Sequence, residues 1–196
     1  MLVPNHGTVR IRAGHRANAR ARQYDLTGAF NGQHFFARCK RILQRLEKSH
    51  DVACVLIVDV DHFKRVNDLH GHISGDTVLQ NAVAICQSVL RASDVFRRLG
   101  GEEFGILMPS CARTQGIAIG NRIRQAIANT CVQVHEQATL TITASIGLAC
   151  TDMTGYAPKP LLIEADTALF AAKHAGRNQL IAGTGVGAPK AAPVSA

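Results

Sequence analysis

Hydrophobic positions along the chain recur with two different periods, which predicts a domain that contains both helices and strands. Apolar residues at helical spacing predict helices over residues 32–48, 61–69, 75–91, 119–127 and 161–172, with Asn31 as the cap of the first. Short apolar runs predict strands over residues 53–58, 95–99, 104–108 and 179–182. Between residues 139 and 148 apolar and polar residues alternate, which predicts one further strand with a single face in the core. The pattern indicates a mixed α/β sandwich with helices packed on a sheet.

The folded block is expected to span residues 24–182 as one domain, because 196 residues suffice for one continuous core. Residues 1–23 are expected to form a basic leader, flexible or helical, and their five arginines carry five of the eight net positive charges. Residues 183–196 are rich in Gly, Ala and Pro, which predicts a disordered tail. The chain has neither an apolar run long enough for a membrane span nor an apolar signal core. We therefore expect an intracellular, cytoplasmic protein without membrane contact.

The basic leader suggests either a contact with nucleic acid or anionic lipid, or simply a solvated segment. It lacks the aromatic residues that interleave with basic residues on a nucleic-acid surface, so the solvated segment is favoured. We expect no nucleic-acid partner.

The six cysteines are spread evenly along the chain, and no two of them form a CxxC pair. That spacing does not suit a zinc clamp or a dithiol redox motif. We expect reduced cysteines that are mostly buried and behave as small hydrophobic side chains.

Acidic residues are scarce, yet two pairs of them occupy notable positions. Asp59 and Asp61 follow a buried apolar strand, and Glu102 and Glu103 lie in the turn between two other strands. Strand ends and hairpin turns meet at sheet edges, and grouped carboxylates repel one another unless a cation joins them. Mg²⁺ is the natural occupant of such a site. The alternative is that each pair consists of ordinary surface acids.

Two further groups of residues suit a nucleotide. Lys173 and Arg177 are four residues apart on the last predicted helix, so they share one face and suit a polyphosphate. Asp76 follows Asn67 and Gly75, and its carboxylate can accept hydrogen bonds from guanine N1–H and the exocyclic amine, which would select GTP over ATP. The alternatives are a solvated helix end and a glycine-bearing loop with a capping aspartate.

With these motifs in order, the sequence resembles the GGDEF-domain diguanylate cyclases. The signature reads GGEEF at residues 100–104, with DVDHFKRVNDLHGHISGD at residues 59–76 and ADTALFAAKHAGRN at residues 165–178. The resemblance covers residues 24–182. It implies an α/β (α+β) fold similar to the nucleotidyl cyclases and polymerase palms, with a mixed, largely antiparallel five-stranded sheet flanked by helices.

The resemblance also implies roles for single residues. Mg²⁺ (or Mn²⁺) would be bound by Asp59, the carbonyl of Val60, Glu102 and Glu103. Guanine would be recognised by Asn67 and Asp76, and phosphates by the backbone amides of Phe63 and Lys64 and the side chains of Lys173 and Arg177. Glu102 and Glu103 are the expected catalytic acids, and Glu102 is the best candidate to help deprotonate the attacking hydroxyl.

The implied reaction joins two GTP molecules into cyclic di-GMP and two pyrophosphates. One domain holds one guanine site, so activity would require a homodimer, which an upstream sensor or receiver partner would assemble. Arg91 and Asp94 form an RxxD motif that resembles the family's product-inhibition site. The alternatives are a local ion pair for this motif and, for the whole chain, a noncatalytic cyclic di-GMP receptor.

The segment at residues 24–33 departs from the family pattern, since Tyr24 replaces the usual first aspartate, and Gly32 and Gln33 replace two arginines. These changes lie outside the expected chemical site, and they bear on the entry turn and on regulatory contacts.

Overall fold

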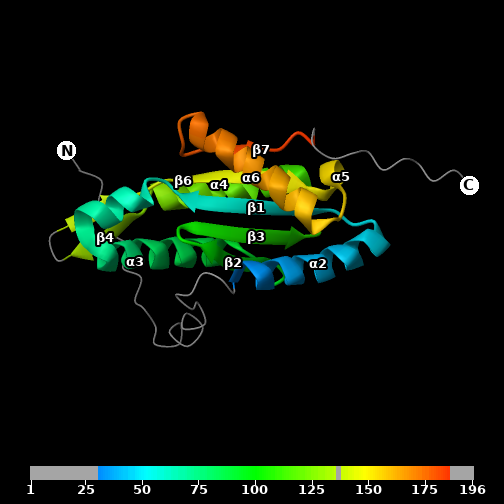
Figure 1. Cartoon of the computed structure of the whole chain (residues 1–196), viewed down its shortest axis with the longest axis horizontal. Coiled ribbons are helices and arrows are strands. Elements are labelled where there is room, and N and C mark those ends of the chain that lie inside the picture. The colour runs from blue at the N-terminus through cyan, green and yellow to red at the C-terminus, as the bar shows by residue number, and fades with distance from the viewer. Residues whose placement is uncertain (1–30, 136–137, 186–196) are drawn as a thin grey trace, which may run out of the picture.

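A five-stranded sheet forms the centre of the structure, a computed structural model that describes residues 31–135 and 138–185. In spatial order its strands are β2 (Val95–Gly100), β3 (Glu103–Pro109), β1 (Ala53–Val60), β6 (Ala144–Cys150) and β7 (Leu180–Ala182). β1 lies between β3 and β6 (Figure 1), and every pairing is antiparallel except that of β6 with β7. The expected mixed, largely antiparallel five-stranded sheet is confirmed.

Helices cover both faces of this sheet. Helices α2 (Asn31–Ser49) and α6 (Pro158–His174) pack on one face, and α3 (Phe63–Val89) and α4 (Arg113–Ala128) on the other. β1 is buried on both sides because alternate residues face opposite layers: Leu56 and Val58 join the α3 and α4 layer, and Val55 and Ile57 join the α2 and α6 layer. The apolar run that predicted this strand is therefore explained by two cores that share one sheet.

The two helices predicted over residues 61–69 and 75–91 form one kinked helix, α3. At Gly71 the backbone leaves the helical region, with φ of 80° and ψ of 164°, a conformation that favours glycine. The first helix starts one residue earlier than expected: Asn31, predicted to cap it, is the first residue of α2.

The prediction of one strand between residues 139 and 148, with a single buried face, is wrong in two respects. It is divided into β5 (Ala138–Thr141), which pairs with β4 (Cys131–His135) in a separate hairpin, and β6 in the main sheet. The chain breaks because the Thr143 carbonyl accepts the Asp61 backbone N–H (2.9 Å). β6 is buried on both faces rather than one. The hairpin strand β4 and the short helix α5 (Thr151–Thr154) were not predicted.

The structure also bears on the expectations for the cysteines and for the two ends of the chain. Five cysteines are buried, Cys131 is exposed and all six are free, as expected. Of the predicted tail, residues 183–185 are described and Gly183 donates to the Leu148 carbonyl (2.7 Å). The basic leader, residues 24–30 and residues 186–196 lie outside the described residues. Among the described helices, none is long and apolar enough to cross a bilayer.

Candidate functional site

The end of β1 and the β2–β3 turn meet at one edge of the sheet. Asp59 lies directly opposite Glu103 in the antiparallel β1–β3 pair, and the Val60 backbone N–H donates to the Glu102 carbonyl (3.3 Å). Arg98 fixes the turn from within, because its Nε donates to the Gly101 carbonyl (2.7 Å). The structure therefore brings Asp59 together with Glu102 and Glu103, and the Val60 backbone contacts the same turn.

Asp59 is buried, with a relative exposure of 5%, whereas Glu102 and Glu103 are half-buried. Its Oδ2 is 2.8 Å from Nζ of Lys173, which reaches it from α6. Burial raises the pKa of Asp59 to about 6, Lys173 acts to lower it, and the negative charges of Glu102 and Glu103 add to the rise. A carboxylate in this environment gains from an additional cation.

The donor set fits a divalent ion shared with a ligand rather than a closed protein cage. Among the described residues, no three His, Cys, Asp or Glu side chains form a group that could hold a metal. Mg²⁺ commonly uses one or two carboxylates and completes its shell with water and phosphate oxygens. Asp59, Glu102 and the Val60 carbonyl offer that kind of partial set.

Asp61 does not join this group, although it follows Asp59 by two residues. Its carboxylate accepts hydrogen bonds from the Thr143 and Ser145 hydroxyls (2.6 Å each) and from the Asn178 backbone N–H (3.1 Å). The interpretation of Asp61 as a metal-facing acid is therefore wrong. Asp61 is a structural anchor that joins the end of β1 to β6 and to the backbone after α6.

Asn67, the residue expected to contact guanine, lies on the first half of α3. Its Oδ1 is buried and has no hydrogen-bond partner. Among the described residues, it is the only buried side-chain nitrogen or oxygen atom that lacks one. Gly75, which follows the kink of α3, packs directly against this oxygen, and a Cβ on Gly75 would collide with it. Asp76 is exposed next to Gly75. An unpaired buried acceptor beside an exposed carboxylate suits a ligand that donates two hydrogen bonds.

The residues expected to contact phosphate lie in two parts of the structure, at the start of α3 and around the end of α6. Phe63 is buried at the first residue of α3, and Lys64 is exposed beside it. Lys173 lies on α6, but Arg177 lies beyond the end of that helix at His174, so the prediction that the two cations share one helix face is wrong. Gly176, with φ of 113°, turns the chain, and Arg177 itself has φ of 63°.

Arg91 and Asp94 face each other in a tight turn directly after α3. The Asp94 carboxylate accepts the Arg91 backbone N–H (2.8 Å), and the Asp94 N–H donates to the Arg91 carbonyl (3.1 Å). The turn thus differs from the local ion pair considered above, because Asp94 bonds the backbone of Arg91. The Arg91 side chain is exposed.

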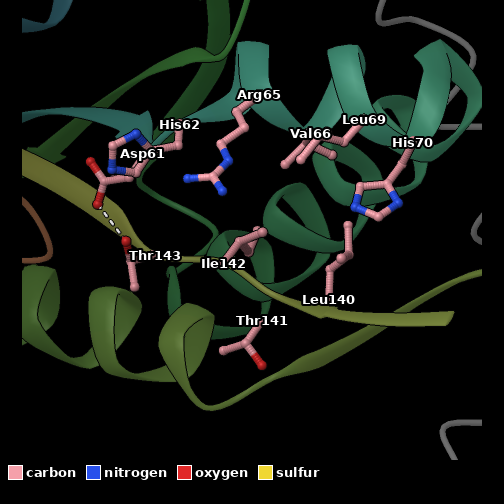
Figure 2. Close-up of a pocket in the computed structure, with 10 residues that line it drawn as sticks. All are labelled: Asp61, His62, Arg65, Val66, Leu69, His70, Leu140, Thr141, Ile142 and Thr143. Atoms are coloured by element: carbon pink, nitrogen blue, oxygen red, sulfur yellow. Dashed lines mark hydrogen bonds between the residues drawn. The ribbon is translucent and has the colours of Figure 1, made fainter.

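The sequence did not predict a groove of about 280 Å³ between the first half of α3 and residues 140–143. Figure 2 shows His62, Arg65 and His70 on the helix side, with Leu140 and Ile142 opposite them. Asp61 lines this groove, but none of the residues that the family resemblance assigns to metal, guanine or phosphate does. The groove depends on the β4–β5 hairpin, which the sequence pattern did not reveal.

A family model described as "Diguanylate cyclase, GGDEF domain" matches residues 22–179. The chain belongs to the GGDEF family. This GGDEF domain is 35% identical over 157 residues to the response regulator PleD of Caulobacter vibrioides, and 36% identical over 157 residues to the probable diguanylate cyclase DgcT of Escherichia coli. Each match covers 80% of the chain, but 35% of PleD and 34% of DgcT. The chain thus spans about a third of the length of these curated relatives.

The GGDEF fold is also shown by a solved structure. The GGDEF domain of DgcB from Caulobacter crescentus, in complex with c-di-GMP, matches with a TM-score of 0.73 and 28% sequence identity. The match covers 78% of this chain and 90% of that one. The GGDEF domain described here therefore has the fold that the sequence motifs implied.

Proposed function

We propose that this GGDEF domain is an active diguanylate cyclase that condenses two GTP molecules into cyclic di-GMP and two pyrophosphates. The observation that carries the proposal is the meeting of buried Asp59 with Glu103 across β1 and β3, next to the Glu102 turn. Membership of the family supports it, as do the residue types at the guanine and phosphate positions.

The proposed metal ligands are Asp59, the Val60 carbonyl, Glu102 and Glu103, which would hold Mg²⁺ or Mn²⁺ together with the triphosphate. The bound ion would supply positive charge to the triphosphate as the α-phosphorus is attacked. Glu102 is the proposed base, which helps to deprotonate the 3′-hydroxyl. Glu103, opposite Asp59, adds a second catalytic carboxylate.

The remaining proposed contacts position the nucleotide. The Asn67 Oδ1 and the Asp76 carboxylate accept hydrogen bonds from the guanine edge, which satisfies the unpaired acceptor. The backbone amides at Phe63 and Lys64 and the cations of Lys173 and Arg177 contact phosphates. Lys173 is 31% exposed while it contacts Asp59, so it has room to turn toward a phosphate.

Assembly follows from the product. One domain presents one guanine site, and a cyclic product with two guanines needs two domains about a twofold axis. We propose that the active form is a homodimer, that a sensor or receiver partner brings the copies together in the cytoplasm, and that Arg91 and Asp94 bind product and inhibit turnover.

The test is product identification by mass spectrometry after incubation of the full chain with GTP and Mg²⁺. The parent protein and Glu47→Ala, whose residue is exposed on α2, are expected to yield cyclic di-GMP, and Glu102→Ala is expected to yield none. Binding of cyclic di-GMP without any turnover of GTP, at protein concentrations that give dimers, would replace the cyclase with a noncatalytic receptor.

A further inference from the structure

Three of the six cysteines gather in the core, although they are far apart in the sequence. Cys54 on β1 and Cys150 on β6 are direct cross-strand partners, and their sulfur atoms are 2.7 Å apart. The Cys54 thiol also lies 3.2 Å from the carbonyl of Cys111, which follows β3. All three are free thiols with 1% exposure or less. The even spacing of cysteines in the sequence gave no sign of this cluster.

Tight packing surrounds the cluster. A Cβ on Gly116 of α4 would lie 2.9 Å from the Cys54 sulfur, so the helix closes directly over it. The three cysteines do not form a metal-binding group, and no group of three or more His, Cys, Asp or Glu among the described residues does. The chemistry open to thiols packed this closely is oxidation to a disulfide.

The geometry of the Cys54 and Cys150 pair suits a disulfide. Directly opposed residues of antiparallel strands have Cα atoms about 4.5 or 5.5 Å apart, depending on their hydrogen bonding. Disulfides bridge Cα separations of about 4.4–6.8 Å. The two strands would therefore need little movement to accept the bond.

The three thiols differ in how readily they ionise. Hydrogen bonds to Cys111 and Cys150, together with burial, raise the pKa of Cys54. The pKa of Cys111 is lowered, first by its hydrogen bond with Cys54 and then by the charge of Arg91, against burial and Asp94. Cys111 also stands between the exposed residues Ser110 and Ala112. All three thiols are buried, but only Cys111 has exposed neighbours in the chain, so we assign it as the thiol that reacts first.

We propose that Cys54, Cys111 and Cys150 form an oxidation site, which a hydroperoxide converts into a Cys54–Cys150 disulfide.

The steps balance with one hydrogen peroxide molecule. The Cys111 thiolate attacks a peroxide oxygen, the O–O bond breaks, and after proton uptake a sulfenic acid and one water result. The Cys54 sulfur attacks the sulfenic sulfur, its proton goes to the departing hydroxide, and a second water leaves with a Cys54–Cys111 disulfide. Cys150 then attacks the Cys54 sulfur and releases Cys111 as a thiol. Two thiols lose two electrons, and the peroxide is reduced to two waters.

The experiment uses the full chain with Cys131→Ser, which removes the exposed thiol. The folded protein is treated with hydrogen peroxide, alkylated and digested with trypsin, which places Cys54, Cys111 and Cys150 in separate peptides, residues 49–64, 99–113 and 125–173. We expect a linked pair of the first and last peptides that dithiothreitol separates. If Cys54 and Cys150 are alkylated as completely as in untreated protein, the proposal is overturned.

Matched variants test the individual thiols. Cys39→Ala and Cys86→Ala, at buried thiols whose pKa burial raises to about 12, are expected to leave the rate of disulfide formation unchanged. Cys111→Ala is expected to slow it at least tenfold, and Cys111→Ser serves as the second variant should alanine perturb folding. An unchanged rate in both Cys111 variants would overturn the role of Cys111 as the entry point.

Discussion

A Cβ on Gly75 would occupy the same space as the buried amide oxygen of Asn67. The expected effect of Gly75→Ala is therefore to push the Asn67 side chain from its place in the proposed guanine site. We expect GTP to bind on the order of tenfold more weakly, with a loss of about 1–3 kcal/mol in the free energy of unfolding from overpacking. Calorimetric titration with a nonhydrolysable GTP analogue and denaturant unfolding measure the two effects.

The matched control for Gly75→Ala is Gln80→Ala, at an exposed position of the same helix. It is expected to leave both the affinity for the GTP analogue and the free energy of unfolding unchanged. Unaltered affinity in the Gly75→Ala protein would show that the space beside Asn67 is not part of the nucleotide site.

Asp59 makes the stability of the metal-free protein depend on pH. Its pKa rises from an ordinary 3.8 to about 6 on folding, so between these values the folded state holds the proton more tightly. Stability from this group is therefore highest below pH 4 and is lost as the pH rises through 6. Between pH 4 and 7 the parent is expected to lose about 2 kcal/mol more than Asp59→Asn. Urea unfolding in the presence of a chelator measures this difference, and parallel pH profiles would contradict it.

Removal of the Asp61 carboxylate would leave two hydroxyls and one backbone N–H without their acceptor. Asp61→Ala is expected to lower the free energy of unfolding by about 3 kcal/mol, because several buried hydrogen bonds to a charged group are lost together. Asp68→Ala, at an exposed position on α3, is the control and is expected to change it by less than about 0.5 kcal/mol. Equal stabilities of the two variants would refute the structural role of Asp61.

The Arg91 and Asp94 turn offers a direct test of product inhibition. Arg91→Ala removes an exposed guanidinium that can pair with a guanine edge or a phosphate. The cyclic di-GMP concentration that halves activity is expected to rise on the order of tenfold. Arg45→Ala, at an exposed position on α2, should leave it unchanged. Full sensitivity in the Arg91 variant would place product inhibition elsewhere.

The sequence predicted the architecture well because periodicity reports burial directly. β1 reads as an uninterrupted apolar run, and the structure buries it on both sides. The approach of Asp59 to the Glu102 turn was also predictable, since strand ends and hairpin turns meet at sheet edges.

Other features depend on long-range contacts that no local pattern carries. The strand at residues 139–148 reads as continuous, but Asp61, about eighty residues earlier, binds Thr143 and Ser145 and so interrupts it. Arg177 follows the helical pattern of α6, yet Gly176 turns the backbone one residue before it. Helical spacing cannot show where a tertiary contact ends the helix.

Asp61 has a mechanical consequence for the whole domain. Its carboxylate accepts the backbone N–H of Asn178, the neighbour of Arg177, and Asp61 directly follows β1, the strand that carries Asp59. The position of the loop between α6 and β7 is therefore coupled to the acidic end of β1 through the Asp61 side chain. Insertions in that loop would disturb the acidic end of β1 unless they kept Asn178 in register.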